Sequence, residues 1–577
     1  MNSHIQKALS LFVTISTVCF AAPLNLRATA QAAENGKSGP GCISQVDTVP
    51  SGLQADLTFP DWAGYVDDTL LMNNIYSFRS YRGQGELYVK CTGLQSADVF
   101  INGQSVNISQ ACENNGKIYK IDISRLTKNG TNTIQINDYA PSDGKINVKI
   151  PYPTVISGNA ASVNVDQDKL DLIDDVINND IKYGFSSAQL AIVKDGVMIK
   201  NTAYGTINAY RQDGTKKSDS RRVVGNTLYD LASNTKMYAT NYALQKLAYE
   251  GKINVNDKVV KYLPEFKDEE NASVKGKADL TLKEVMEHQA GFPADPQYYN
   301  EHFNQETQKE DAGVKNELFS QDKNTTVQMI MKTPLQYQPG TRTLYSDVDY
   351  MLLGVIVEKI TGEPLDQYVE NTIYKPMGLN HIVFNPLKKG FHVDDCAATE
   401  IDGNVFGGTL DFLNVRTKTI EGEVHDAKAY YSMGGVSGHA GLFASAGDLA
   451  KLCQVMLNGG GYGGNKFFDQ NTIEHALFGK VKTKKQKLSI HADLRRSGSR
   501  PNPLSNLKKP AEWRIAYHFR TFLFMERPFP ISAGGEKSND QCNCRCQPEG
   551  RRRQDHDLRQ SRYRADTGRE KGALGGQ

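Results

Sequence analysis

Ser233 and Lys236, a serine and a lysine three residues apart, carry the clearest chemical signal in the chain. They stand where an apolar run begins that predicts a helix, and at this spacing both side chains lie on one helix face. The lysine amine can then lie beside the serine hydroxyl. A hydroxyl is a weak nucleophile at neutral pH and needs an adjacent base. The pair therefore predicts a serine nucleophile with Lys236 as its proton acceptor.

The same spacing of serine and lysine occurs at Ser142, Ser320 and Ser505, so the spacing alone carries little weight. Only Ser233 follows an apolar stretch, residues 228–232, and precedes a helical pattern that stops at a glycine. Ser142 opens a turn between strands, Ser320 lies among acids and amides, and Ser505 lies in a loop rich in proline and lysine. Context therefore selects Ser233.

A second group must assist Lys236, because the lysine can act as a base only if burial and a neighbouring cation or phenol lower its pKa. The best candidate is Tyr345, which a Pro-Gly turn brings to the start of an apolar helix predicted from Asp347 to Ile360. The Tyr298-Tyr299-Asn300 segment is the competing candidate, but only because its residue types match. No periodic segment follows it, so we interpret it as surface aromatics in a loop.

Two folded regions are predicted to position these residues. Residues 59–155 contain short alternating runs bounded by turn residues, with a hairpin signal at Asn102-Gly103, which predicts an all-β sandwich. Residues 165–480 begin with an amphipathic helix near 170–181 and a hairpin that turns at Asp195-Gly196, and then become mostly helical. The second pattern predicts an α+β domain.

Nine cysteines occur in the chain, and their spacing indicates no metal site. Cys91 and Cys112 both fall in the predicted sandwich. They could form a disulfide in an oxidising compartment or remain free thiols.

Four segments, in the expected order, resemble the serine β-lactamase and penicillin-binding-protein superfamily, in its class C β-lactamase, DD-carboxypeptidase and esterase branch. They are Ser233–Lys236, Leu282–Phe292, Pro339–Tyr345 and Gly434–Phe443. The predicted sandwich resembles the galactose-binding-like jelly rolls attached to many glycosidases. With such a sandwich ahead of the catalytic domain, the arrangement is most similar to the penicillin-binding protein 4B type.

The resemblance implies that residues 165–480 form an antiparallel sheet flanked by helices. It also implies a role for each candidate residue. Ser233 is the acylated nucleophile and contributes half of the oxyanion hole through its backbone N–H, Lys236 accepts its proton, and Tyr345 shuttles a proton to the leaving group. Asp347 stands where many relatives carry Asn, and it is the expected substrate-binding residue. His439-Ala440-Gly441 matches an earlier family segment, so we interpret it as a structural turn. No metal and no cofactor is expected.

The implied activity is hydrolysis of D-alanyl peptides of peptidoglycan through a serine acyl-enzyme, with β-lactams binding as a consequence. An esterase or a β-lactamase could use the same site, and a wall-binding protein with a non-functional catalytic fold is the alternative from another class. Cell-wall carbohydrate is a further expected partner of the sandwich, although a structural or docking role fits it equally. Nucleic acid is not an expected partner.

The N-terminus predicts export. Residues 1–32 combine a short polar start, an apolar stretch and small residues near Ala30, which is typical of a secretory signal peptide. Residues 33–58 are small and polar and predict a linker. We expect the protein to work outside the cytoplasmic membrane, attached to it only if the signal segment stays uncleaved.

Residues 481–577 differ in composition from the rest of the chain, with 22 Lys and Arg against 10 Asp and Glu. The family's third motif, a triplet that starts with Lys or His and ends in Gly, should follow Phe443 but does not occur. We interpret this region as a frameshifted tail rather than a basic tail for an anionic polymer. We expect it to be disordered, and the 577-residue chain to be impaired.

Overall fold

The structure is a computed structural model that describes residues 43–474, except residues 60, 62–64, 67–68, 73, 142 and 406–409, and two short strands at 515–516 and 523–524. The predicted signal peptide, residues 1–32, lies outside the described residues. So does the predicted tail, residues 481–577, apart from those two strands.

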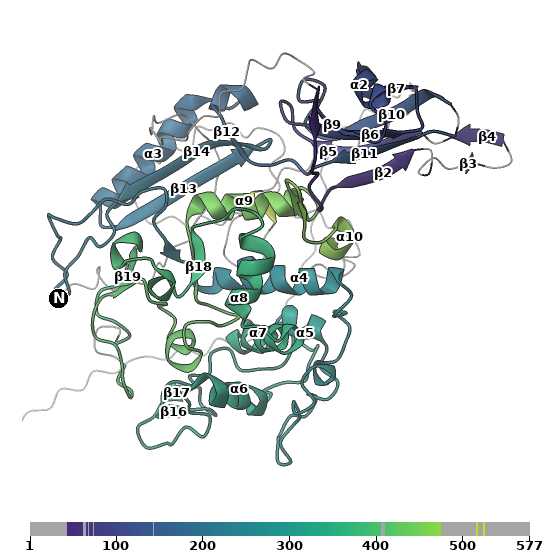
Figure 1. The fold of residues 1–577 in the computed structure, drawn as a ribbon. Coiled ribbons are helices and arrows are strands. Elements are labelled where there is room, and N and C mark those ends of the chain that lie inside the picture. The colour runs from purple at the N-terminus through teal and green to yellow at the C-terminus, as the bar shows by residue number, and fades with distance from the viewer. Residues whose placement is uncertain are drawn as a thin grey trace, which may run out of the picture. The chain divides into compact units, whose positions relative to one another are not determined.

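Two antiparallel sheets form the first folded region and bury one shared core (Figure 1). The first sheet has the order β1-β9-β6-β11-β2, with β1 at Ile43–Val46, β9 at Ile118–Asp122, β6 at Glu86–Thr92, β11 at Lys145–Ile150 and β2 at Ala55–Phe59. The second has the order β5-β10-β7-β8, with β5 at Ile75–Ser80, β10 at Gly130–Ala140, β7 at Ser96–Ile101 and β8 at Gln104–Val106. The jelly-roll topology of this region stays a prediction.

The linker prediction is wrong from residue 43 onward. Ile43–Val46 pairs with β9 and Ala55–Phe59 pairs with β11, so both segments are strands of the first sheet. Their sequences are short and half polar because one face of each is at least partly solvated, and the period-2 signal is therefore weak.

Both predicted hairpin turns are confirmed. Asn102 and Gly103 join β7 to β8 with φ of 51° and 79°, and Asp195 and Gly196 join β13 to β14 with φ of 52° and 72°. Two successive residues with positive φ define the turn that matches the twist of paired strands, and Asn-Gly and Asp-Gly adopt it readily.

Cys91 in β6 and Cys112 in the short helix α2 (Ser109–Glu113) are both buried free thiols. Their sulfur atoms lie 3.2 Å apart. Of the two alternatives, a disulfide or free thiols, the structure has two free thiols in contact.

The second folded region begins with a sheet of order β12-β14-β13, formed by Ile156–Ser157, Val197–Gly205 and Ser187–Lys194. Helix α3 (Gln167–Lys182) packs on one face, where Leu190 and Ile192 join its apolar side, and helix α9 (Ala446–Leu457) packs on the other, against Ala191. Alternate residues of β13 are therefore buried on opposite faces. Within the described residues, β13 pairs only with β14.

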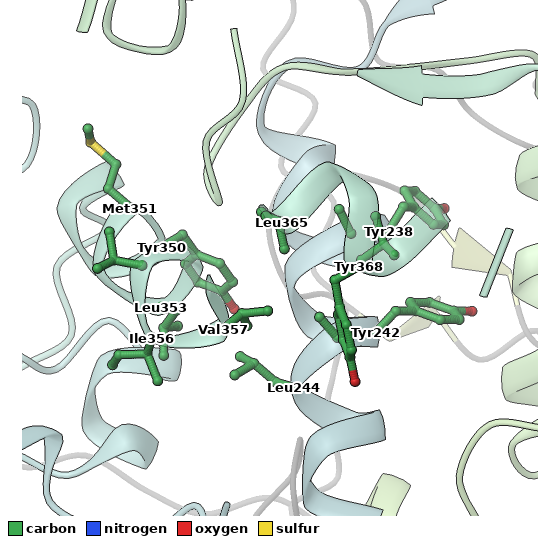
Figure 2. Close-up of a cluster of buried hydrophobic side chains, with 14 of the residues drawn as sticks. Tyr238, Tyr242, Leu244, Tyr350, Met351, Leu353, Ile356, Val357, Leu365 and Tyr368 are labelled. Carbon is green, nitrogen blue, oxygen red and sulfur yellow. The ribbon is translucent and has the colours of Figure 1, made fainter. Parts of the chain in front are cut away.

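A helical core lies beside this sheet and supports the site. Helices α4 (Asn241–Tyr249), α7 (Asp347–Thr361) and α8 (Leu365–Val369) bury one cluster that includes Leu244, Leu353 and Leu365 (Figure 2). The remaining helices of the described region include α5 at Leu282–Met286, α6 at Lys323–Lys332 and α10 at Gln470–Thr472. The predicted helix from Asp347 to Ile360 is confirmed, and Ser346 caps it by accepting a hydrogen bond from the Val348 N–H.

A small second sheet of order β15-β21-β18 leads directly into the segment that bears Ser233. Its strands are Tyr229–Asp230, Leu442–Ala444 and Ile382–Phe384, and all pairs are antiparallel. The described two-stranded sheets are β3-β4 at Tyr65–Val66 and Thr69–Met72, β16-β17 at Phe303–Asn304 and Lys309–Glu310, β19-β20 at Ala398–Glu400 and Ile420–Glu421, β22-β23 at Gly461–Tyr462 and Asn465–Lys466, and β24-β25 at Ile515–Ala516 and Leu523–Phe524. None of the helices in the described part has the length and apolar character needed to cross a membrane.

Candidate active site

Ser233 lies just after strand β15, on a strained turn. Ala232 has a φ of 45°, a left-handed conformation that costs a non-glycine residue free energy and is kept only where the surroundings enforce it. Asp230 enforces it here, because one of its carboxylate oxygens accepts the Ala232 N–H at 2.8 Å and the other accepts the His425 N–H at 2.6 Å. Ser233 itself is exposed, so its hydroxyl is open to a substrate.

Lys236 lies beneath this serine and is buried. It opens a single π-helical turn, Lys236–Thr240, that leads into α4. Its Nζ is 3.0 Å from Ser233 Oγ, 2.6 Å from Tyr345 OH, 2.8 Å from Asp347 Oδ1 and 3.3 Å from the His439 carbonyl oxygen. An ammonium has three hydrogens, so these four oxygens compete for them.

The four residues predicted from the sequence, Ser233, Lys236, Tyr345 and Asp347, are therefore brought together around one nitrogen atom. Ser233 and Lys236 come from one helical segment, whereas Tyr345 and Asp347 come from the start of α7. The path from Ser233 Oγ through Lys236 Nζ to Tyr345 OH consists of two hydrogen-bond distances. Such a path can move a proton between the nucleophile and a leaving group.

The resting site does not meet the condition of a lowered lysine pKa. Burial alone would lower the pKa of Lys236, but the Asp347 carboxylate and Tyr345 outweigh burial and hold the pKa above its ordinary value. The resting lysine is therefore an ammonium. It cannot accept the serine proton until the Lys236–Tyr345 pair has lost one proton.

A second buried lysine, Lys428, lies on the far side of Asp347. Its Nζ is 3.1 Å from Asp347 Oδ2 and 3.9 Å from Asp426 Oδ2, and it also contacts Asp295. Burial alone would raise the pKa of Asp347, but Lys428 and then Lys236 hold that pKa well below its usual range. Asp347 is thus a charged carboxylate between two ammonium groups.

His439 closes the cluster. Its ring Nε2 is 2.9 Å from Asp426 Oδ1, its Nδ1 is 2.8 Å from Ser437 Oγ, and its carbonyl oxygen faces Lys236. The sequence assigned His439 to a structural turn. It does lie in a bend, but it also lines the site.

Carboxylate and imidazole atoms of Asp347, Asp426 and His439 lie within 4.8 Å of one another, which is a donor set that could suit a metal ion. The Lys428 ammonium contacts both carboxylates of this set. The protein therefore supplies its own cation at this position.

The surface interpretation of Tyr298-Tyr299-Asn300 is wrong. Tyr298 and Asn300 are completely buried, and Tyr299 packs against Phe412 and Tyr431 with ring centroids 4.7 and 6.0 Å apart. The segment is a loop, as expected, but it is an internal one. Its role is packing beside the site.

Comparison with known proteins agrees with this geometry. The Beta-lactamase family model matches residues 171–513, more than half of the chain, and the chain therefore belongs to the beta-lactamase family. It is a serine hydrolase of that family. The match extends past residue 480, where the predicted frameshift would begin.

Two similar proteins come from Salmonella. A protein of Salmonella schwarzengrund named "Putative D-alanyl-D-alanine carboxypeptidase" is 54% identical over 325 residues, which make up 56% of this chain and 72% of that protein. A protein of Salmonella typhimurium with the same name is 53% identical over the same shares of the two chains. Among solved structures, the octameric penicillin-binding protein homologue from Pyrococcus abyssi is 22% identical, over 54% of this chain and 59% of that chain, with a TM-score of 0.38.

Proposed function

We propose that this chain is a serine hydrolase that acts outside the cytoplasmic membrane on peptides ending in D-alanyl-D-alanine, and that β-lactams acylate it at Ser233. The observation that carries the proposal is the hydrogen-bonded path from Ser233 through Lys236 to Tyr345. It occurs in a chain 54% identical to a protein named for this carboxypeptidase activity.

The geometry supports a two-step reaction. Ser233 Oγ attacks the carbonyl carbon of the penultimate D-alanine, and its proton passes to the deprotonated Lys236–Tyr345 pair. Tyr345 then protonates the nitrogen of the departing terminal D-alanine, which leaves an ester on Ser233. Water hydrolyses this ester in the second step and releases the shortened peptide.

The carboxylate of Asp347 is not free to bind the substrate amide. Its two carboxylate oxygens each face a lysine, Oδ1 facing Lys236 and Oδ2 facing Lys428. We therefore propose that Asp347 sets the charge of the site, and that its contact with the substrate amide is secondary.

Labelling with a fluorescent penicillin tests the proposal. We expect Ser233→Ala to abolish covalent labelling. Ser320→Ala should leave it intact, because Lys323, three residues after Ser320, pairs with Glu358. Mass spectrometry of the labelled peptide should place the adduct on Ser233. Labelling that survives Ser233→Ala would remove Ser233 from the nucleophile role.

Substrate class is tested separately. Release of D-alanine from a D-alanyl-D-alanine peptide should exceed hydrolysis of a short-chain ester by the same preparation, and the reverse result would favour the esterase alternative. A folded chain that neither hydrolyses a substrate nor takes up penicillin, yet sediments with peptidoglycan, would favour the wall-binding alternative.

For the sandwich we propose contact with cell-wall carbohydrate. A shallow groove of about 430 Å³ lies on the outer face of its first sheet, with Tyr88, Lys90, Asn147 and Lys149 among its lining residues. Sedimentation with purified peptidoglycan after the catalytic serine has been blocked by penicillin should persist. Loss of sedimentation on blocking would assign wall binding to the catalytic site instead.

A further inference from the structure

A buried pair, His288 and Asp349, lies behind Tyr345. Both residues are about 1% exposed, and Asp349 Oδ2 is 2.7 Å from His288 Nδ1. The reaction described above assigns no step to either side chain. Asp349 stands two residues after Asp347 on α7, and His288 follows the short helix α5.

His288 holds the backbone on both sides of Tyr345. Its carbonyl oxygen accepts the Leu344 N–H at 2.9 Å, and its ring Nδ1 accepts the Ser346 N–H at 3.2 Å. Its ring also packs beside the Tyr345 ring, with centroids 4.6 Å apart. His288 thus fixes the position of Tyr345 in three ways: it bonds the backbone of the preceding residue, it bonds the backbone of the following residue, and it packs beside the tyrosine ring.

The backbone of His288 is itself strained, with a φ of 56°. A non-glycine residue keeps this conformation only where its surroundings enforce it, and such residues cluster at functional sites. Here the strain coincides with the three contacts to Tyr345 and its neighbours. The conformation is therefore part of how the tyrosine is placed.

The position of one hydrogen follows from these contacts. Because Nδ1 of His288 accepts the Ser346 N–H, it carries no hydrogen of its own, and its single lone pair faces both the Ser346 N–H and Asp349 Oδ2. The hydrogen in the 2.7 Å contact must then belong to Asp349. The other oxygen, Asp349 Oδ1, is buried and has no hydrogen-bond partner among the described residues, which a neutral acid tolerates far better than a carboxylate.

Electrostatics agrees with this assignment. Burial raises the pKa of Asp349 well above its ordinary value, and burial together with the nearby Lys236 lowers the pKa of His288 to about 3. Both groups are therefore uncharged at neutral pH. A neutral imidazole adds no further positive charge beside the crowded Lys236.

We propose that Asp349 is a protonated carboxylic acid that donates its O–H to His288 Nδ1, and that the two residues form a positioning pair for Tyr345. The pair rests on the proposed function only through the role of Tyr345 in proton transfer. What the proposal specifies chemically is the location of one proton, and this location can be measured without any substrate. A buried acid that is kept neutral in order to donate a hydrogen bond is known chemistry in enzyme sites.

Two spectroscopic measurements on the full chain test the proton directly. In protein labelled with ¹⁵N-histidine, the His288 signal, identified by its loss in His288→Gln, should show an unprotonated Nδ1 and a protonated Nε2 at neutral pH. Infrared difference spectra should show the carbonyl stretch of a protonated carboxylic acid that disappears in Asp349→Asn and persists in Asp279→Asn, which changes an exposed carboxylate. A protonated Nδ1, or no such stretch, would overturn the proposal whether or not the enzyme is active.

The positioning role is tested by penicillin acylation of Ser233. Asp349→Asn retains an N–H that can donate to Nδ1, and it should acylate within about threefold of the parent chain. Asp349→Leu removes the donor and frees the ring, and a displacement of the tyrosine by about 1 Å should slow acylation by about 10²-fold. Equal rates for the two variants would reject the positioning role, and an unfolded Leu variant would leave the ¹⁵N and infrared results to decide the proton.

Discussion

Lys428 Nζ lies 3.1 Å from Asp347 Oδ2, while the other oxygen of the same carboxylate lies 2.8 Å from Lys236 Nζ. One buried charge is thus shared by two ammonium groups. A carboxylate at this position attracts a proton to Lys236 more strongly than the amide that many relatives of the resembled family carry there. Lys428 offsets part of that attraction, so the Asp347 position and Lys428 form one electrostatic unit.

We predict that Lys428→Met destabilises the protein by about 3–5 kcal/mol, because it leaves the Asp347 carboxylate buried beside fewer cations. Asp347→Asn should also destabilise, since it leaves Lys428 less well paired. The double variant removes both charges and should cost clearly less than the sum of the two single changes. Urea unfolding at pH 7, arranged as a double-mutant cycle, measures this coupling.

The matched control for this cycle is the exposed pair of Lys258 and Asp279, whose charged atoms are 2.6 Å apart. Lys258→Met should change the free energy of unfolding by no more than about 1 kcal/mol. If the losses of unfolding free energy in Lys428→Met and Asp347→Asn simply add in the double variant, the two residues do not form a single electrostatic unit.

The cost of Lys428→Met should depend on pH. In the parent chain the pKa of Asp347 is lowered, so its stabilising contribution is present above the ordinary carboxyl pKa of about 4 and is lost only as the pH falls well below that value. In the variant this pKa rises, so the carboxyl can take up a proton and relieve the unpaired charge in acid. The difference in unfolding free energy between the two proteins should therefore be largest near pH 7 and shrink towards pH 4. A difference that stays constant over this range would rule out the carboxylate as its source.

We predict that Gly438→Ala impairs the site without changing any charged group. A Cβ at Gly438 would lie 2.0 Å from the carbonyl oxygen of Tyr350, so the segment must move away from α7 and carry His439 with it. Penicillin labelling should fall sharply, and the melting temperature should drop. Gly225→Ala is the control, because the nearest atom to its new Cβ, Asn201 Nδ2, would be 3.9 Å away. Normal labelling by Gly438→Ala would show that the site does not need this close approach.

The predicted frameshift has a consequence for activity. Strand β13 pairs only with β14 in the described region, and the family's third motif, absent after Phe443, would supply an oxyanion donor. The loss of one such donor costs about 10²–10³ in rate. We expect the 577-residue chain to label weakly with penicillin and to aggregate in size-exclusion chromatography. A chain whose residues after 480 come from another reading frame, one that restores the triplet, should label at Ser233, and full labelling by the present sequence would refute the frameshift interpretation.

Local chemistry explains which parts of the fold were predictable. The hairpin turns at Asn102-Gly103 and Asp195-Gly196 consist of residue types that accept positive φ, so a pair of adjacent residues is enough to predict each turn. Strand β1 could not be found in this way, because Ile43–Val46 has a polar middle and its pairing with β9 depends on residues more than 70 positions later.

The same limit applies to the site. Ser233 and Lys236 are neighbours on one helical segment, so their spacing predicts their contact. Lys428 could not be predicted, because its partner Asp295 is 133 residues away and nothing in the local sequence marks the lysine as buried. Tyr299 was misjudged for a similar reason, since its burial depends on Phe412 and Tyr431 from a distant segment.

The pairing of β15 with β21 also limits when the surroundings of Ser233 can be completed during synthesis. Lys236 and the His439 carbonyl that it contacts are 203 residues apart, and ribosomes add about 5–20 residues per second, so the second partner is made roughly 10–40 s after the first. Leu231 and Ala239, which are buried in the finished protein, belong to a core cluster that also includes Leu442 and later residues, so this core is incomplete during that interval. We therefore expect the segment that bears Ser233 to stay accessible to chaperones until the residues after 439 have been added.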